Sequence, residues 1–103
     1  MSHTLSIIEN SPSNKTFVFE GDFTIQNIES TKNEILKHTK GCDTIILNIN
    51  KITNFDITFT QMVLAFTIHC ENQKISLNIQ SSEMDEECKK TMEKSGFNKI
   101  IRI

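Results

Sequence analysis

Hydrophobic residues fall into short, separate groups along the chain, and their spacing predicts alternating strands and helices. The first two groups, residues 4–9 and 16–20, are rich in the aliphatic, β-branched and aromatic side chains that strands favour. Asn, Ser and Pro residues stand between them, and these residue types close turns. We therefore expect a hairpin at the start of the fold.

A helix is predicted next, over residues 24–39. Thr24 is placed to cap it, its apolar residues recur at a loose helical spacing, and Gly41 ends it. The clearest strand follows at residues 44–49. Its core, the near-continuous apolar run Ile-Ile-Leu-Asn-Ile of residues 45–49, indicates a strand that is central in a sheet or covered on both faces.

A second helix is expected to begin at Thr58, which we assign as its N-cap. Its buried stripe steps by three or four residues and comprises Phe59, Met62, Val63, Phe66 and Cys70. Alternation predicts a fourth strand at residues 75–79, followed by a third helix with the inner face Met84, Cys88 and Met92, and a short last strand at residues 99–103.

This order of elements predicts an α/β fold. We expect a mixed β-sheet with an N-terminal hairpin, residues 45–49 near its centre, and about three helices packed mainly on one face. A chain of 103 residues has room for one core, so residues 1–103 are expected to form a single domain.

Composition and charge narrow the function classes. Hydrophobic residues make up 37% of the chain and charged residues 23%, which is typical of a folded globular protein. A net charge of −2 argues against a nucleic-acid partner. No apolar run approaches the roughly 20 residues that a membrane helix needs, and no signal peptide is evident, so we expect a cytoplasmic location without membrane insertion. Three widely spaced cysteines predict reduced thiols.

The segment 45–58, Ile-Ile-Leu-Asn-Ile-Asn-Lys-Ile-Thr-Asn-Phe-Asp-Ile-Thr, resembles the signature of STAS domains. That family, typified by bacterial anti-sigma factor antagonists, has an apolar strand, a loop ending in Asp, and a Ser or Thr that opens a helix. Residues 21–24 and 96–97 resemble two further turns of the family, and the order of elements agrees over roughly residues 15–103. The resemblance implies a STAS-type fold and a non-enzymatic role in signal transduction through protein–protein interaction.

Three departures from the family pattern stand out. Phe59 replaces the usual small residue after the phosphorylated one, Ile57 directly follows the Asp, and the helix that commonly follows the last strand is missing. Residues 56–62 look more like variant STAS proteins found beside chemotaxis-type histidine kinases in bacteria. With no last helix, apolar surface near Ile103 is expected to support self-association or partner docking.

The resemblance assigns Thr58 as the phosphorylation site, which would make the chain a phosphoprotein. Asp56 is kept as a recognition residue that could orient the Thr58 hydroxyl or bind a metal brought by a kinase's nucleotide. The alternative is a loop carboxylate near the helix start, where the helix dipole favours negative charge. The implied partner-binding surface comprises Asp56, Ile57, Phe59, Gln61 and Met62. The implied partner is a GHKL-type serine/threonine kinase–anti-sigma factor or a related histidine-kinase complex, with a homo-oligomer as a further possibility.

Two other roles stay open: a small STAS accessory subunit of a phospholipid-transport ABC system, and an unphosphorylated scaffold in a chemotaxis-type kinase complex. An enzyme is not expected, because no nucleophile–base arrangement or Gly-rich phosphate loop is present. No cofactor is expected. His38 with Cys42, and His69 with Cys70, lack further ligands at a recognised spacing, so no metal site is predicted either.

Overall fold

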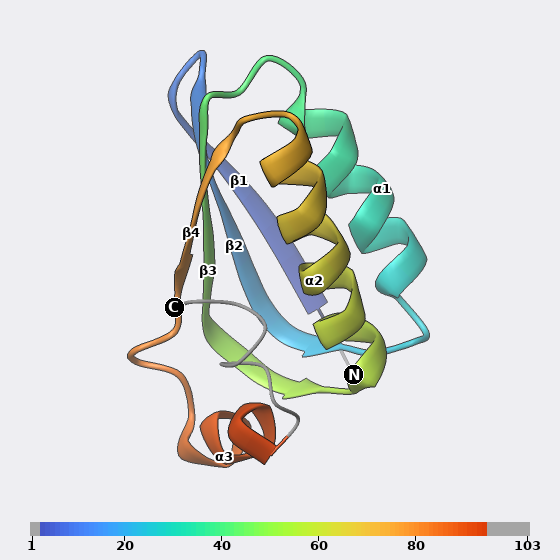
Figure 1. Ribbon diagram of the computed structural model, residues 1–103. Helices are drawn as coiled ribbons and strands as arrows, with labels where there is room; N and C mark the ends of the chain where they lie inside the picture. Colours follow the sequence, from blue (N-terminus) through green and yellow to red (C-terminus); the bar gives the residue numbers. More distant parts are fainter. Residues whose placement is uncertain (1–2, 95–103) are drawn as a thin grey trace.

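Four strands and three helices make up residues 3–94, the part of the chain that the computed structural model describes (Figure 1). The strands are β1 (His3–Ser11), β2 (Asn14–Phe23), β3 (Thr44–Phe55) and β4 (Ser76–Gln80), and the helices are α1 (Ile28–Thr39), α2 (Ile57–Asn72) and α3 (Glu86–Lys94). They follow one another in the predicted order. The strand predicted at 99–103, and the docking surface expected beside it, lie outside the described residues.

The described strands form one mixed sheet in the order β1-β2-β3-β4. β1 and β2 make the antiparallel hairpin, and the other two pairs are parallel. α1 connects β2 to β3, and α2 connects β3 to β4. Right-handed crossovers that proceed in the same direction across a sheet place their helices on the same face, and the two helices lie side by side on one face here (Figure 1). α3 lies at the end of the sheet, where the Cys88 thiol donates to the carbonyl of Ile52 at 3.7 Å. The predicted α/β class and mixed sheet are confirmed.

The core lies between the sheet and the helix pair. Phe17, Leu47 and Ile79 stand in register on three neighbouring strands and are all buried. On the opposite face, Val18 and Ile46 are half-buried. The apolar run of residues 45–49 therefore reflects a central strand with one fully buried face, because its alternate side chains point to opposite sides of the sheet.

Several predicted boundaries differ from the structure, two of them by four residues or more. β3 continues to Phe55, six residues past the predicted end, because residues 50–55 go on pairing with β2 beyond two shifts in register. α1 begins at Ile28, so Thr24 does not cap it. Thr24 opens a turn instead: Asn27 accepts from the Thr24 amide through its side chain at 3.2 Å and donates its own amide to the Thr24 carbonyl at 3.0 Å.

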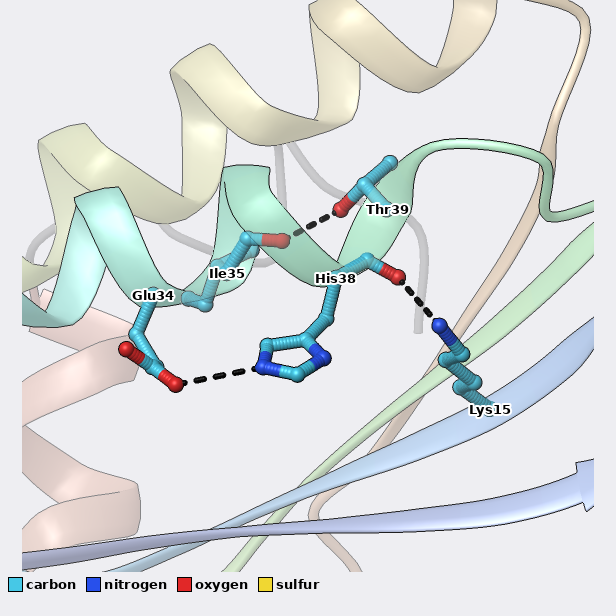
Figure 2. A network of polar contacts seen from close by, with 5 residues as sticks. All are labelled: Lys15, Glu34, Ile35, His38 and Thr39. Carbon is cyan, nitrogen blue, oxygen red and sulfur yellow. Dashed lines mark hydrogen bonds and ion pairs between the residues drawn. The ribbon is translucent and has the colours of Figure 1, made fainter.

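The far end of α1 is fastened to the sheet (Figure 2). The Lys15 ammonium, on β2, donates to the His38 carbonyl at 3.0 Å, where positive charge also suits the helix dipole. Thr39 donates to the Ile35 carbonyl at 2.6 Å, and the His38 ring lies 3.2 Å from the Glu34 carboxylate on the helix surface. The Lys15–His38 hydrogen bond joins the end of α1 to the sheet, whereas the other two contacts lie within the helix.

Candidate functional site

Asp56 links the first turn of α2 to the loop after β2. It stands between Phe55, the last residue of β3, and Ile57, the first of α2. Its Oδ1 accepts hydrogen bonds from the Thr58 backbone amide, at 3.0 Å, and from the Thr58 hydroxyl. Its Oδ2 accepts from the backbone amide of Ile25 at 2.9 Å. A single carboxylate thus joins two segments that lie 31 residues apart.

The residue that caps α2 is Asp56, and the prediction that Thr58 caps it was wrong. Asp56 has an extended backbone and its carboxylate accepts from the amide two residues ahead, as an N-cap side chain does. Thr58 is the second residue inside the helix. Thr58 is half-buried, and its hydroxyl is oriented by Asp56, which is one of the roles that the sequence left open for this carboxylate.

The electrostatics of Asp56 follow from these contacts. Partial burial acts to raise its pKa, but hydrogen bonds from the Thr58 hydroxyl and from nearby backbone amides outweigh that effect. The pKa of Asp56 therefore lies below its ordinary value. The group that holds the Thr58 hydroxyl is a carboxylate anion at neutral pH.

Three of the predicted partner-binding residues contribute to the surface around Thr58. The Ile57 side chain is 67% exposed directly beside Asp56, and Gln61 is exposed one turn further along α2. Met62 is buried, yet it borders the groove between the two helices. The structure therefore brings Asp56, Ile57, Gln61 and Met62 together at one end of α2.

Phe59 does not belong to this surface, so its prediction as a partner contact was wrong. Its side chain is fully buried, with its ring centroid 5.8 Å from those of Phe19, Phe23 and Phe55. Such aromatic contacts are typical of a core. Phe59, which stands where STAS domains usually have a small residue, thus fills the interior below α2. Its ring does not cover the exposed side of Thr58.

Sequence reasoning missed a groove of about 630 Å³ between α1 and α2. Thr58 borders it near the start of α2, and His69 borders it near the end of the same helix. Its apolar lining includes Ile28, Ile35, Met62 and Phe66. One signal could have found it: α2 carries no Asp, Glu, Lys or Arg between residues 57 and 70, although much of its outer side is exposed.

The cysteines and other possible ligands lie elsewhere. Cys42, Cys70 and Cys88 are buried free thiols, and burial, with a smaller contribution from Cys42, raises the pKa of Cys70 to about 11. Among residues 3–94, no three His, Cys, Asp or Glu side chains gather where they could hold a metal ion. None of the described helices is both long and apolar enough to cross a membrane.

Comparison with known proteins agrees with this architecture. The anti-sigma factor antagonist SpoIIAA in its unphosphorylated form matches with a TM-score of 0.77 and 14% identity, over 94% of this chain and 84% of that one. The Bacillus cell-fate determinant SpoIIAA in its phosphorylated form matches with a TM-score of 0.69 and 15% identity, over 94% and 87%. Mglu matches with a TM-score of 0.67 and 10% identity, over 76% of this chain but only 19% of Mglu.

At these identities the structural similarity establishes a shared fold. No curated protein matches the sequence as a relative. The family assignment comes from the sequence itself, which matches the STAS domain over residues 6–103. This chain therefore belongs to the STAS domain family.

Proposed function

We propose that this protein is a regulatory protein-binding module, similar in role to an anti-sigma factor antagonist, whose affinity for its partner is set by phosphorylation of Thr58. One observation carries the proposal: a half-buried hydroxyl on the first turn of α2, oriented by the Asp56 carboxylate, lies close to the exposed Ile57 side chain. SpoIIAA, which shares this fold, is described in both an unphosphorylated and a phosphorylated form, and this supports the proposal.

Phosphorylation would change the charge at this point strongly. A phosphate adds about −1.5 to −2 charges at neutral pH. The phosphoryl group would replace the hydroxyl proton that now donates to Asp56, so two anions would stand side by side. Two like unit charges 4 Å apart repel by about 1 kcal/mol in water and about 4 kcal/mol near a protein surface. The modification would therefore disturb the contact of Asp56 with the first turn and place charge where a partner would cover Ile57.

The partner proposed for this surface is a GHKL-type serine/threonine kinase–anti-sigma factor or a related histidine-kinase complex in the cytosol. Such a partner could both bind the Thr58 end of α2 and modify it. The buried position of Phe59 favours the switch over an unphosphorylated scaffold, because the bulky ring points into the core and does not shield the hydroxyl.

The test uses the kinase encoded nearest to this gene. The purified kinase is incubated with the protein and ATP, and mass spectrometry locates any phosphate. Affinity is then measured by calorimetry for Thr58→Glu, for Thr58→Val, and for the matched control Thr60→Glu. Among the described contacts, the wild-type Thr60 hydroxyl bonds only to the Ile57 carbonyl, one turn earlier.

We expect phosphate on Thr58 and an affinity loss of about tenfold or more for Thr58→Glu, equivalent to about 1.4 kcal/mol. Thr58→Val and Thr60→Glu should bind within about threefold of the wild type. Wild-type affinity of Thr58→Glu together with unmodified Thr58 would refute the switch. Capture of an ABC ATPase in place of a kinase would point to the accessory-subunit role.

A further inference from the structure

The groove between α1 and α2 is an apolar surface that continues from the switch residue. It runs beside α2 from Thr58 to His69, which is about 16 Å at a rise of about 1.5 Å per residue. Ile25 at the Thr58 end is 70% exposed, and Leu36 on the α1 side is 36% exposed. Large apolar side chains are thus open to solvent at both ends of the α1 wall, as is common where a partner binds.

We propose that this groove binds an amphipathic helix of the partner protein. The inference names the recognition element for the surface proposed above, and so it rests on that proposed function. An amphipathic helix lays apolar residues spaced three, four and seven positions apart into such a groove. About three turns would match the length of α2 that borders it.

The two walls of the groove specify the chemistry of the occupant. The α2 wall carries Gln61 and Ala65 and no Asp, Glu, Lys or Arg. The α1 wall carries Glu29 and Lys32, which lie about one turn apart and have opposite charges. We therefore infer a helix with its apolar stripe on the groove floor, its uncharged edge along α2, and a charged edge along α1. On that edge, a basic residue would face Glu29 and an acidic residue would face Lys32.

A helix fits better than the other classes of occupant. An extended peptide needs unpaired backbone groups, but those in the middle of α1 and α2 are hydrogen-bonded within their own helices. A lipid chain needs a site that covers most of its surface, whereas this groove has strongly exposed residues along its rim. A helix brings its own backbone hydrogen bonds and needs only one buried stripe.

The groove also explains how a single phosphate could control a long contact. Thr58 borders the groove itself, so a phosphate would put negative charge at one end of the apolar floor. Any helix seated from Thr58 to His69 would have to cover that charge or withdraw from this end. Switch and groove would then form one continuous binding surface.

The probe is a display library of 14-residue peptides with every position randomised. Peptides are selected on the wild-type protein alone, and the binding of the selected peptides is then compared on Ala65→Arg. Ala65 is exposed on α2 and borders the groove, so an arginine at this position blocks the groove without removing core contacts. Arginine is also a good helix former, so α2 should stay intact. The matched control is Ile68→Arg, which places the same charge on the same helix at a half-exposed site outside the groove lining.

We expect the selected peptides to carry apolar residues at helical spacing with both charge signs on one edge. They should shift amide resonances of α1 and α2 in NMR titrations. Ala65→Arg should weaken their binding about tenfold or more, while Ile68→Arg retains it and both variants keep wild-type circular dichroism. Selection of alternating, strand-like sequences, or of peptides indifferent to Ala65→Arg, would overturn the proposal. A wild-type dimer that Ala65→Arg dissociates would also overturn it, by identifying a second copy as the occupant.

The kinase partner separates this inference from the proposed function. Loss of kinase affinity in Thr58→Glu with full affinity in Ala65→Arg would overturn the groove and leave the switch standing. Loss of kinase affinity in Ala65→Arg with full affinity in Thr58→Glu would support binding in the groove and refute the phosphorylation switch.

Discussion

Replacing Asp56 with alanine should destabilise the protein by about 1–3.5 kcal/mol at neutral pH. Loss of an N-cap side chain costs about 0.5–2 kcal/mol. The hydrogen bond from the Ile25 amide joins a second segment and adds about 0.5–1.5 kcal/mol. The Thr58 hydroxyl adds little, because it is half-exposed and can bond to water instead. For a domain of about 100 residues, this loss corresponds to a melting temperature lower by about 4–28 °C.

Urea unfolding followed by circular dichroism measures this loss. Intrinsic fluorescence offers little, since the chain has no Trp and no Tyr. The effect also depends on pH. Because folding lowers the pKa of Asp56, its charge-dependent stabilisation is present above about pH 4 and is lost as the pH falls through the folded-state pKa. The gap between wild type and Asp56→Ala should therefore narrow below about pH 4.

The control is Asp43→Ala. Asp43 is an exposed loop residue for which the described contacts include no side-chain hydrogen bond, so its loss should cost within about 0.5 kcal/mol. A cost of Asp56→Ala no larger than that of this control at pH 7 would refute the role of Asp56 as a cap and tether. A gap to wild type that is the same at pH 2.5 as at pH 7 would refute its charge-dependent part.

The other predictions concern packing and reactivity. Leu47→Ala should cost about 2–5 kcal/mol in urea unfolding, since its side chain is fully buried in a central strand, and a loss under about 1 kcal/mol would contradict that burial. Phe59→Ala should cost about 3–5 kcal/mol in the same assay, and a variant with near wild-type stability would contradict the burial of Phe59. Thr58→Ala should cost about 1 kcal/mol or less, because Asp56 provides the cap, whereas a larger loss in the same assay would make Thr58 a capping group. Cys70 should resist iodoacetamide at pH 8 until the protein is unfolded, as its pKa of about 11 keeps it a thiol, and rapid labelling of folded protein, located by mass spectrometry, would refute this.

Hydrophobic spacing predicted most of the fold because it records which side chains must be buried. The stripe of α2 is an example: Phe59, Met62, Val63, Phe66 and Cys70 are all buried, as their spacing required. The family resemblance assigned Phe59 and Met62 to the partner surface at the same time. The structure resolves this conflict in favour of spacing for Phe59, while Met62 both packs in the core and borders the groove.

What the sequence could not predict depends on contacts between distant segments. Asp56 and Thr58 are both residue types that cap helices, and only the backbone geometry decides between them. The hydrogen bond from Ile25 to Asp56 crosses 31 residues, so no local pattern contains it. The extension of β3 likewise depends on pairing with β2 past two register shifts, which residues 50–55, four of them polar, do not indicate by themselves. The groove needs both helices in place.

The uncharged character of α2 has a consequence for how the chain reaches its folded state. From Ile57 to Ile68 the segment has no charge and no proline, and it is rich in β-branched and aromatic residues, the composition of sequences that stack into aggregates. Before α2 docks on the sheet, this segment is an aggregation hazard. Asp56 and Glu71 stand at its two ends as charged gatekeepers. Removing Asp56 should thus lower the yield of soluble protein by more than its stability alone implies, most strongly at high expression temperature.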